Sequence, residues 1–353
     1  QMLEIANALS KNAKLLVMDE PTAALSGKEV EILFDTIKDI KTRGIGIIYI
    51  SHKLEEVKRI GDRITVLRDG ANVATLDAEA TDLNEVINLM IGKEMRTGQN
   101  IRANEPTGEE LFRVERLSNG NLPVAVNLTV HRGEILGITG LVGSGKTALA
   151  QALFGVDPWT TGAAYLGGRP VRYRSPRHAI KLGMGFLPED RDADGLCLNM
   201  GVKENLSLVQ LAMLRSFFFS VANERRTARE IVAAIAIKTA GLSQQVKYLS
   251  GGNKQKVVLG KWLGANCRLL ILDEPTIGID VGARREIYDL IRDFVDEGER
   301  GVVFVSSDMT EVLDVADRIL VMSDAKIVAD LDPAEATQQM IMAYCLQGAH
   351  TAQ

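Results

Sequence analysis

The sequence predicts an α/β fold, in which a mostly parallel sheet is covered by helices on both faces, and it predicts two tandem copies of this fold. Over residues 111–307, short apolar runs alternate with segments of helical periodicity. Residues 1–25 also align with residues 255–279, and the match continues from 50–64 to 305–319 after a one-residue insertion in the second copy. A repeat of this length indicates tandem domains rather than a solenoid.

The repeat divides the chain into three parts. Residues 1–92 correspond to the C-terminal part of one domain, because the first copy lacks everything that precedes residue 255 in the second. Residues 93–110 are polar, contain Gly, Asn and Pro and show no apolar period, which is typical of a linker. Residues 111–353 form a second, complete domain. Since Gln1 leads directly into the repeat, we expect the first copy to be incomplete and the protein to be truncated at its N-terminus.

The composition of the chain excludes several classes of protein. Its 353 residues are 46% hydrophobic and 25% charged with a net charge of −5, which excludes a disordered or fibrous chain and predicts no nucleic-acid partner. Three scattered cysteines without a C-x-x-C spacing argue against a disulfide framework or a zinc site and favour a reducing compartment. The most apolar stretch, residues 206–222, contains Arg215 and is shorter than the ~20 residues of a membrane span, so we expect no transmembrane segment.

The second domain shows the clearest order of elements. Strands are predicted at 111–118, 124–133 and 134–140, and a helix at 146–155. Further helices are predicted at 229–241 and 285–297, together with buried strands in the apolar runs 268–273 and 301–307. This alternation of strands and helices requires a mostly parallel sheet.

A phosphate-binding loop is predicted between the strand at 134–140 and the helix at 146–155. The segment GLVGSGKT fits G-x-x-x-x-G-K-[ST] in the strand–loop–helix context that the motif requires. Its glycines let backbone N–H groups surround phosphates, its lysine reaches the outer phosphates, and its threonine hydroxyl can ligate magnesium. The predicted ligands of ATP are Gly140, Leu141, Val142, Gly143, Ser144, Gly145, Lys146 and Thr147.

Paired carboxylates end a buried strand in each copy. Asp273 and Glu274 follow the apolar run RLLIL, and Asp19 and Glu20 follow LLVM. The aspartate of each pair is predicted to hold Mg²⁺, and the glutamate is predicted to orient an attacking water. The pattern is weak alone, since such a pair can simply begin a turn, but it occurs twice and follows a phosphate loop.

A second anion-binding feature is predicted at Ser250, Gly251 and Gly252. These residues precede the helical stretch NKQKVVLGKWL, and a helix N-terminus beside glycines favours a bound anion. The alternative is that Ser250 only caps the helix.

Together these motifs resemble the ATP-binding domains of ABC transporters. GLVGSGKT, LSGGNKQ, LLILDEP and ISHKLEEV are similar to the Walker A, signature, Walker B and switch-histidine regions of that family. The tandem copies, with FLPEDRDADGL and LSGGNKQK, resemble more narrowly the fused sugar-import subunits of the ribose, galactose and xylose type. The resemblance implies the P-loop NTPase fold of the ABC type, in which an antiparallel β subdomain and a helical subdomain accompany the mostly parallel sheet.

The resemblance also implies two composite sites, each closed by the signature of the opposite domain. It assigns catalytic roles to Glu20, His52 and Glu274 and a phosphate-closing role to the signature around Ser250. In the second copy Glu189 stands where the family usually has glutamine, and Ser307 stands at the place of His52. Serine matches neither the reach nor the charge of imidazole, so we expect this site to bind ATP and to hydrolyse it poorly. The usual aromatic residue that stacks on adenine is absent from residues 119–126.

The function predicted from the sequence is that of the ATPase subunit of a sugar importer. It would bind ATP and Mg²⁺, lie on the cytoplasmic face of the membrane and drive permease subunits that receive sugar from a separate binding protein. Two alternatives remain open at this point, a soluble paired ATPase of translation or DNA repair and an inactive fragment. Because neither composite site is complete in this chain, the isolated chain is expected to be poorly active.

Overall fold

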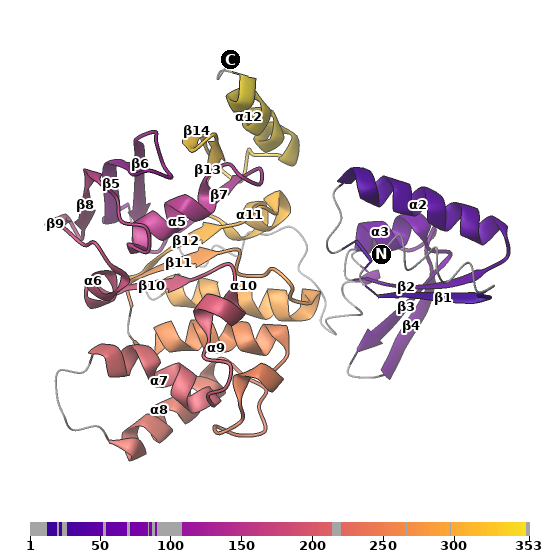
Figure 1. Cartoon of the computed structure of the whole chain (residues 1–353), viewed down its shortest axis with the longest axis horizontal. Helices are drawn as coiled ribbons and strands as arrows, with labels where there is room; N and C mark the ends of the chain where they lie inside the picture. The colour runs from indigo at the N-terminus through magenta and orange to yellow at the C-terminus, as the bar shows by residue number, and fades with distance from the viewer. Residues whose placement is uncertain are drawn as a thin grey trace. The chain divides into compact units, whose positions relative to one another are not determined.

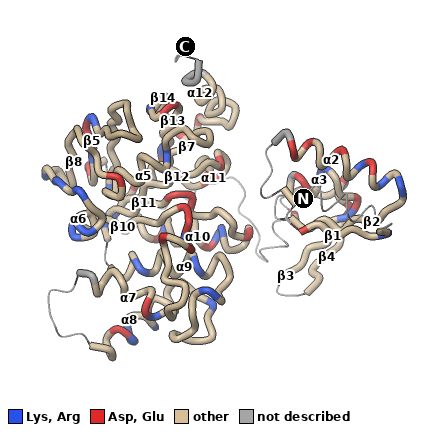
Figure 2. The backbone as a smooth tube through the Cα atoms, viewed as in Figure 1, with Lys and Arg blue, Asp and Glu red and all other residues tan. Residues whose placement is uncertain are grey.

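The computed structural model describes residues 13–19, 21–22, 27–51, 54–68, 71–83, 85–86, 89, 108–213, 220–265, 267–296 and 298–350. The chain divides into two compact units (Figure 1), the first comprising residues 1–97 and 280–282 and the second residues 98–279 and 283–353. Nowhere in the described part is a helix both long enough and apolar enough to cross a bilayer. Basic and acidic residues are interspersed along the elements of both units (Figure 2).

The second unit is built on a six-stranded sheet. Its strand order is β10 (Met184–Leu187), β11 (Leu269–Asp273), β12 (Gly301–Val305), β7 (Ile135–Gly140), β13 (Arg318–Ser323) and β14 (Lys326–Leu331). The first five strands are parallel, and β14 pairs with β13 in the antiparallel direction. Every residue of β7, β11 and β12 is buried, as expected for strands covered on both faces.

Helices pack on this sheet and leave the carboxyl ends of its strands at one edge. Helix α5 (Lys146–Phe154) contacts β7, β10, β11 and β12, and α11 (Met309–Val315) contacts β7. The C-terminal helix α12 (Gln338–His350) lies against β13, β14 and β7. Helix α6 (Pro176–Lys181) contacts β10, and α10 (Val281–Asp296) contributes Ile287 and Ile291 to the hydrophobic core. Ligands of parallel sheets bind outside the carboxyl ends of the strands, so this edge is where a site is expected.

Two smaller parts complete the second unit and confirm the predicted subdomains. One is an antiparallel sheet with the order β6 (Val126–His131), β5 (Glu110–Ser118), β8 (Thr161–Leu166) and β9 (Arg169–Val171). The other is helical and contains η1 (Arg191–Gly195), α7 (Val202–Met213), α8 (Val221–Ala234), η2 (Val246–Tyr248) and α9 (Gly251–Leu263), which gather at one end of the unit (Figure 1). One continuous hydrophobic core joins the sheet to both parts.

The predicted helix at 229–241 is wrong in its second half, because α8 ends at Ala234. Ala236 adopts a left-handed conformation with a φ of 50°. The N–H of Ile237 then bonds back to the carbonyl of Val232 at 3.0 Å, and Ile237 is buried. This pattern terminates a helix and folds the following apolar residue onto the core. The helical spacing of apolar residues therefore continues beyond Ala234, although the packing of Ile237 on the core ends the helix there.

The first unit repeats part of the second in the same order. It contains β1 (Leu15–Asp19), α2 (Gly27–Thr42), β2 (Gly46–Ile50), α3 (Leu54–Ile60), β3 (Arg63–Arg68) and β4 (Ala71–Asp77). The pair β1–β2 is parallel and the pair β3–β4 is antiparallel, as are β11–β12 and β13–β14. The register shifts between Val66 and Leu67 in one hairpin and between Val321 and Met322 in the other, which are equivalent positions. The sequence repeat is thus a structural repeat.

Candidate active site

The phosphate loop of the second unit joins β7 to α5, as predicted. Gly143 and Gly145 have φ values of 84° and 96°, in the left-handed region that favours glycine. The N–H of Ser144 bonds to the carbonyl of Leu141 at 3.1 Å, and the carbonyl of Ser144 accepts the N–H of Ala325 at 2.9 Å. These bonds close the loop over the N-terminus of α5, where free backbone N–H groups favour an anion.

Gly140 is required by close approach of the chain. A Cβ at this position would lie 2.2 Å from the carbonyl oxygen of Met322 and 2.7 Å from the Ser144 hydroxyl. A Cβ on Gly143 would meet no atom within 4 Å, so that glycine is required by its backbone conformation alone. The two glycines therefore serve the same loop for different physical reasons.

Lys146 is buried at the first position of α5 and folds back onto the loop. Its Nζ donates to the carbonyl oxygens of Gly140 at 2.8 Å and Leu141 at 2.9 Å. Burial lowers the pKa of Lys146, and the negative charges of Glu274 and Asp273 oppose this shift. The carbonyl oxygens are neutral hydrogen-bond acceptors, so a bound phosphate would supply the negative charge that the Lys146 ammonium group needs.

Asp273 lies at the end of β11, beside the phosphate loop. Its Oδ1 lies 3.4 Å from the Thr147 hydroxyl, and only 1% of the residue is exposed. Burial, followed by the charges of Glu189 and Glu274, raises the pKa of Asp273 to about 7, while Thr147 and Lys146 act in the opposite direction. A cation placed next to this buried carboxyl group would stabilise its charged form.

Glu274 and Ser307 meet at the same edge of the sheet. The backbone N–H of Ser307 donates to Glu274 Oε1 at 2.7 Å, and the Ser307 hydroxyl donates to the same oxygen at 2.6 Å. Glu274 has a φ of 48°, and its N–H bonds to the carbonyl of Val305 at 2.9 Å. The Ser307 hydroxyl therefore contacts the carboxylate that is predicted to be catalytic, which the sequence did not indicate.

The residues of the second anion-binding feature lie elsewhere in the unit. Ser250 is the N-cap of α9, but its hydroxyl makes no capping bond and instead accepts from Asn253 Nδ2 at 2.8 Å. A Cβ on Gly251 would lie 3.0 Å from the Gly278 carbonyl, and one on Gly252 would lie 2.5 Å from Ala283 Cβ. Helix α9 packs against α7, α8, η1 and the edge strand β10, whereas α5 packs on β7, β10, β11 and β12. The structure does not bring these residues onto the phosphate loop.

The other predicted residues have different outcomes. Glu189 follows β10 and is exposed, and its charge acts on Asp273 and Lys146. Asp19 ends β1 in the first unit, where it is exposed. Glu20 and His52 lie outside the described residues.

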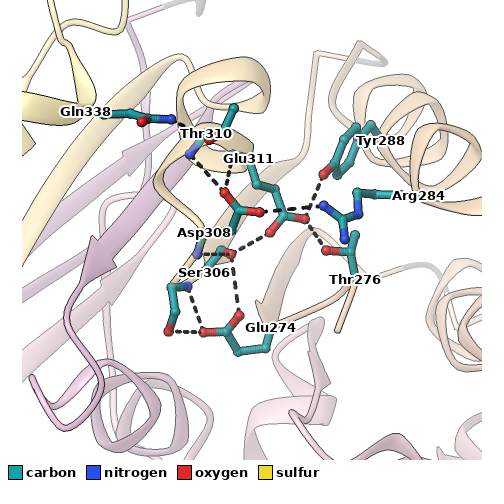
Figure 3. A network of polar contacts seen from close by, with 10 residues as sticks. Glu274, Thr276, Arg284, Tyr288, Ser306, Asp308, Thr310, Glu311 and Gln338 are labelled. Atoms are coloured by element: carbon teal, nitrogen blue, oxygen red, sulfur yellow. Dashed lines mark hydrogen bonds and ion pairs between the residues drawn. The ribbon is translucent and has the colours of Figure 1, made fainter. Parts of the chain in front are cut away.

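Four further residues at this edge were not predicted. The Glu311 carboxylate accepts hydrogen bonds from the hydroxyl groups of Thr276, Tyr288 and Ser306 (Figure 3). The repeat contained a signal for the glutamate, because EEV at 55–57 aligns with TEV at 310–312. The hydroxyl partners come from three separate segments, which no local pattern connects.

The oxygen ligands near the phosphate loop suit a hard cation. Among the described residues, no group of three or more His, Cys, Asp or Glu side chains forms a metal site by itself. Magnesium sites at nucleotides commonly need only one or two protein oxygens, because phosphates and waters supply the rest. Asp273 and Thr147 provide two such oxygens 3.4 Å apart.

Comparison with known proteins agrees with this geometry. The family model described as ABC transporter matches residues 124–277. The ribose import ATP-binding protein RbsA of Geobacillus kaustophilus is 44% identical over 344 residues, which cover 97% of this chain and 69% of that protein. The ribose import ATP-binding protein RbsA 1 of Rubrobacter xylanophilus is 45% identical over 354 residues, covering 100% of this chain and 70% of that protein.

Solved structures support the same fold. The dimeric post-hydrolysis state of the ATP-binding cassette MJ0796, bound to ADP and Pi, superposes with a TM-score of 0.56 at 22% identity and covers 63% of this chain and 99% of that one. The cbiO1 structure from Clostridium perfringens has a TM-score of 0.56 at 22% identity and covers 69% of this chain and 100% of that one. With its phosphate loop, its carboxylate pair and these relatives, the chain belongs to the ATP-binding proteins of ABC transporters, within the ribose/galactose import type.

Proposed function

We propose that this chain is the ATP-binding and ATP-hydrolysing subunit of an importer for a monosaccharide or a related small solute, with its nucleotide site in the second unit. The observation that carries the proposal is the convergence of Lys146, Thr147, Asp273 and Glu274 at one edge of the parallel sheet, with Thr147 Oγ1 3.4 Å from Asp273 Oδ1. Relatives with import functions for ribose and galactose cover almost the whole chain.

Binding of ATP would exchange internal contacts of the loop for contacts with phosphate. Lys146 would leave the carbonyl oxygens of Gly140 and Leu141 for the outer phosphates, while the backbone N–H groups of the loop hold the inner ones. Thr147 and Asp273 would hold Mg²⁺, which neutralises phosphate charge when it is bound. Asp273 would lose its proton when Mg²⁺ binds, since a neighbouring cation stabilises the charged form.

Hydrolysis would depend on Glu274. Its Oε1 is anchored by Ser307, so the carboxylate has a fixed orientation before any substrate enters. Held in this way, Glu274 would orient a water for attack on the terminal phosphorus, a task that requires positioning more than covalent chemistry. Ser307 would thus support the carboxylate, whereas the histidine usual at this place would contact the phosphate itself.

The remaining parts of the proposal concern organisation and partners. Residues 1–92 would belong to one ATP-binding domain, 93–110 to a linker and 111–353 to a second domain. The protein would act from the cytoplasmic face of the membrane on separate permease subunits, which exchange sugar with an external binding protein. The signature residues around Ser250 would close on a nucleotide held by another ATP-binding domain.

Co-purification tests this function against a role in translation or repair. A tagged chain, expressed in its native cells and extracted in mild detergent, should retain a permease with several membrane-spanning helices. The Lys146→Ala variant is the control for the nucleotide site and should retain the permease without binding ATP. Recovery of ribosomes or a DNA-repair complex in place of a permease would overturn the proposal.

A further inference from the structure

Glu311 is a buried carboxylate at the start of α11 for which the chemistry described above has no role. Only 3% of the residue is exposed, and it accepts hydrogen bonds from three hydroxyl groups on three different segments. Thr276 follows β11, Tyr288 lies in α10 and Ser306 follows β12 (Figure 3). A carboxylate removed from water needs such partners, so these bonds hold the three segments together.

The Ser306 hydroxyl connects this network to Glu274, the proposed catalytic group. Ser306 Oγ lies 2.5 Å from Glu311 Oε2 and 3.4 Å from Glu274 Oε2, and it accepts the N–H of Asp308 at 3.1 Å. A hydroxyl group has one hydrogen to donate, and the shorter contact takes it. Within the described part of the chain, Glu274 Oε2 therefore has only that long contact, while its Oε1 is held by Ser307.

The first unit contains similar hydrogen bonds around Glu56, the residue equivalent to Glu311, which is half-buried there. Its Oε2 accepts from Thr22 Oγ1 at 2.8 Å and from the Tyr49 hydroxyl at 2.8 Å. Thr22 is the equivalent of Thr276, since each follows the D-E-P of its own copy. The threonine and the glutamate thus keep both their places and their contact in the two units.

The tyrosine, in contrast, changes its place. In the second unit the hydroxyl comes from Tyr288, eighth in α10, and its ring contacts that of Phe304, fourth in β12. In the first unit the eighth residue of α2 is Phe34 and the fourth of β2 is Tyr49. The two aromatic residues have exchanged identities, yet a hydroxyl group reaches the glutamate in both units.

Packing alone does not explain this exchange. Two phenylalanines would fill the same space, and removing the hydroxyl from a buried ring carries no cost unless the hydroxyl has a partner that needs it. Each unit instead keeps one phenylalanine and one tyrosine, with the hydroxyl directed at the glutamate from whichever side carries it. The requirement is therefore for the hydrogen bond to the carboxylate, not for a ring at a given position.

We propose that Glu311 is a positioning residue for hydrolysis: by accepting the hydrogen bond of the Ser306 hydroxyl and fixing the turn at Thr276, it leaves Glu274 Oε2 open to bind the attacking water. This inference rests on the proposed function. The hydroxyl of Tyr288 keeps the Glu311 carboxylate in place, so that it can hold Ser306. Without the hydrogen bond to Glu311, the Ser306 hydroxyl would donate to Glu274 Oε2 and occupy the oxygen that has to bind the water.

The test moves the hydroxyl group from one ring to the other. Tyr288→Phe removes it, and the double variant Tyr288→Phe with Phe304→Tyr restores it from the strand, as in the first unit. Single-turnover hydrolysis with the full chain in excess over ATP should fall about tenfold in Tyr288→Phe, less than the roughly 10²-fold loss that a 1 Å misplacement costs. The double variant should recover to within about twofold of wild type. ATP affinity should stay within about twofold throughout, since no phosphate ligand changes.

Phe304→Tyr alone is the matched control, because it adds a hydroxyl without removing one, and it should hydrolyse ATP at the wild-type rate. A second readout needs no turnover: amide hydrogen exchange of residues 305–308 should accelerate in Tyr288→Phe and return to the wild-type rate in the double variant. An unchanged exchange rate in Tyr288→Phe, or a double variant as impaired as the single one, would overturn the role of Glu311. A wild-type chain that binds no ATP would instead overturn the proposed function.

Discussion

The Asp273→Asn variant removes a buried carboxyl group whose pKa is raised from its ordinary value of 3.8 to about 7, first by burial and then by the charges of Glu189 and Glu274. Between these two pH values the folded protein keeps a proton that the unfolded chain has released. The free energy of unfolding therefore falls as the pH rises from about 4 to about 7. The stabilising contribution is fully present below the lower value and is lost above the upper one.

The size of this effect follows from the shift. One pKa unit corresponds to about 1.4 kcal/mol, so the interval of about two units between pH 5 and pH 7 lowers the unfolding free energy of the wild type by about 3 kcal/mol. Asparagine has nearly the same volume and does not titrate. Without nucleotide and Mg²⁺, Asp273→Asn should therefore gain about 3 kcal/mol on the wild type between pH 5 and pH 8. The same variant should lose Mg²⁺-dependent ATP binding.

Tryptophan fluorescence gives a selective assay. Both tryptophans of the chain, Trp159 and Trp262, belong to the second unit, so their signal in urea reports the unfolding of that unit. Glu189→Gln is the matched control, because it removes an exposed neighbouring charge but leaves Asp273 able to titrate; the pH dependence should persist with a smaller shift. Parallel pH profiles for the wild type and Asp273→Asn would show that Asp273 does not keep its proton in the folded protein over this pH range.

Three further predictions concern the same site. Gly140→Ala should lower the unfolding free energy of the second unit by about 3 kcal/mol or more, because its Cβ would lie 2.2 Å from the Met322 carbonyl oxygen. Gly143→Ala should lower it by only about 1 kcal/mol. Equal losses for the two variants in urea unfolding would contradict this difference. Ser307→Ala removes the hydroxyl bond to Glu274 but keeps the N–H bond, so single-turnover hydrolysis should fall about three- to tenfold, and an unchanged rate would show that the hydroxyl group is not used. Glu274→Gln should keep ATP affinity within about twofold and slow hydrolysis by about 10²-fold or more; joint loss of binding and hydrolysis would argue for a binding role instead.

The sequence predicted the features that local patterns encode. The phosphate loop, the D-E pair after a buried strand and the tandem repeat are all visible in short runs of sequence. In the structure Lys146 begins α5 and Asp273 ends β11. The parallel sheet followed from the alternation of strands with helices. The end of α8 at Ala234 was missed because a left-handed residue, Ala236, stops the helix inside a segment of good helical periodicity.

The contacts between segments could not be predicted from one sequence. The sequence allowed Ser307 to be compared with His52 only in reach and charge. Its contact with Glu274 depends on the pairing of β11 with β12. The network around Glu311 likewise joins residues up to 35 positions apart. The aligned repeats contain Phe34 and Tyr49 in one copy and Tyr288 and Phe304 in the other. Only the structure shows that the tyrosine hydroxyl of each copy bonds to a glutamate.

The most direct test of the central claim is a calorimetric titration of the full chain with ATP in the presence of Mg²⁺. The chain carries one phosphate loop, so we expect one ATP bound per chain and loss of that binding in Lys146→Ala. An exposed lysine of the same unit provides the control, and Lys181→Ala should bind as the wild type does. Two bound nucleotides, or undiminished binding in Lys146→Ala, would contradict the assignment of the site.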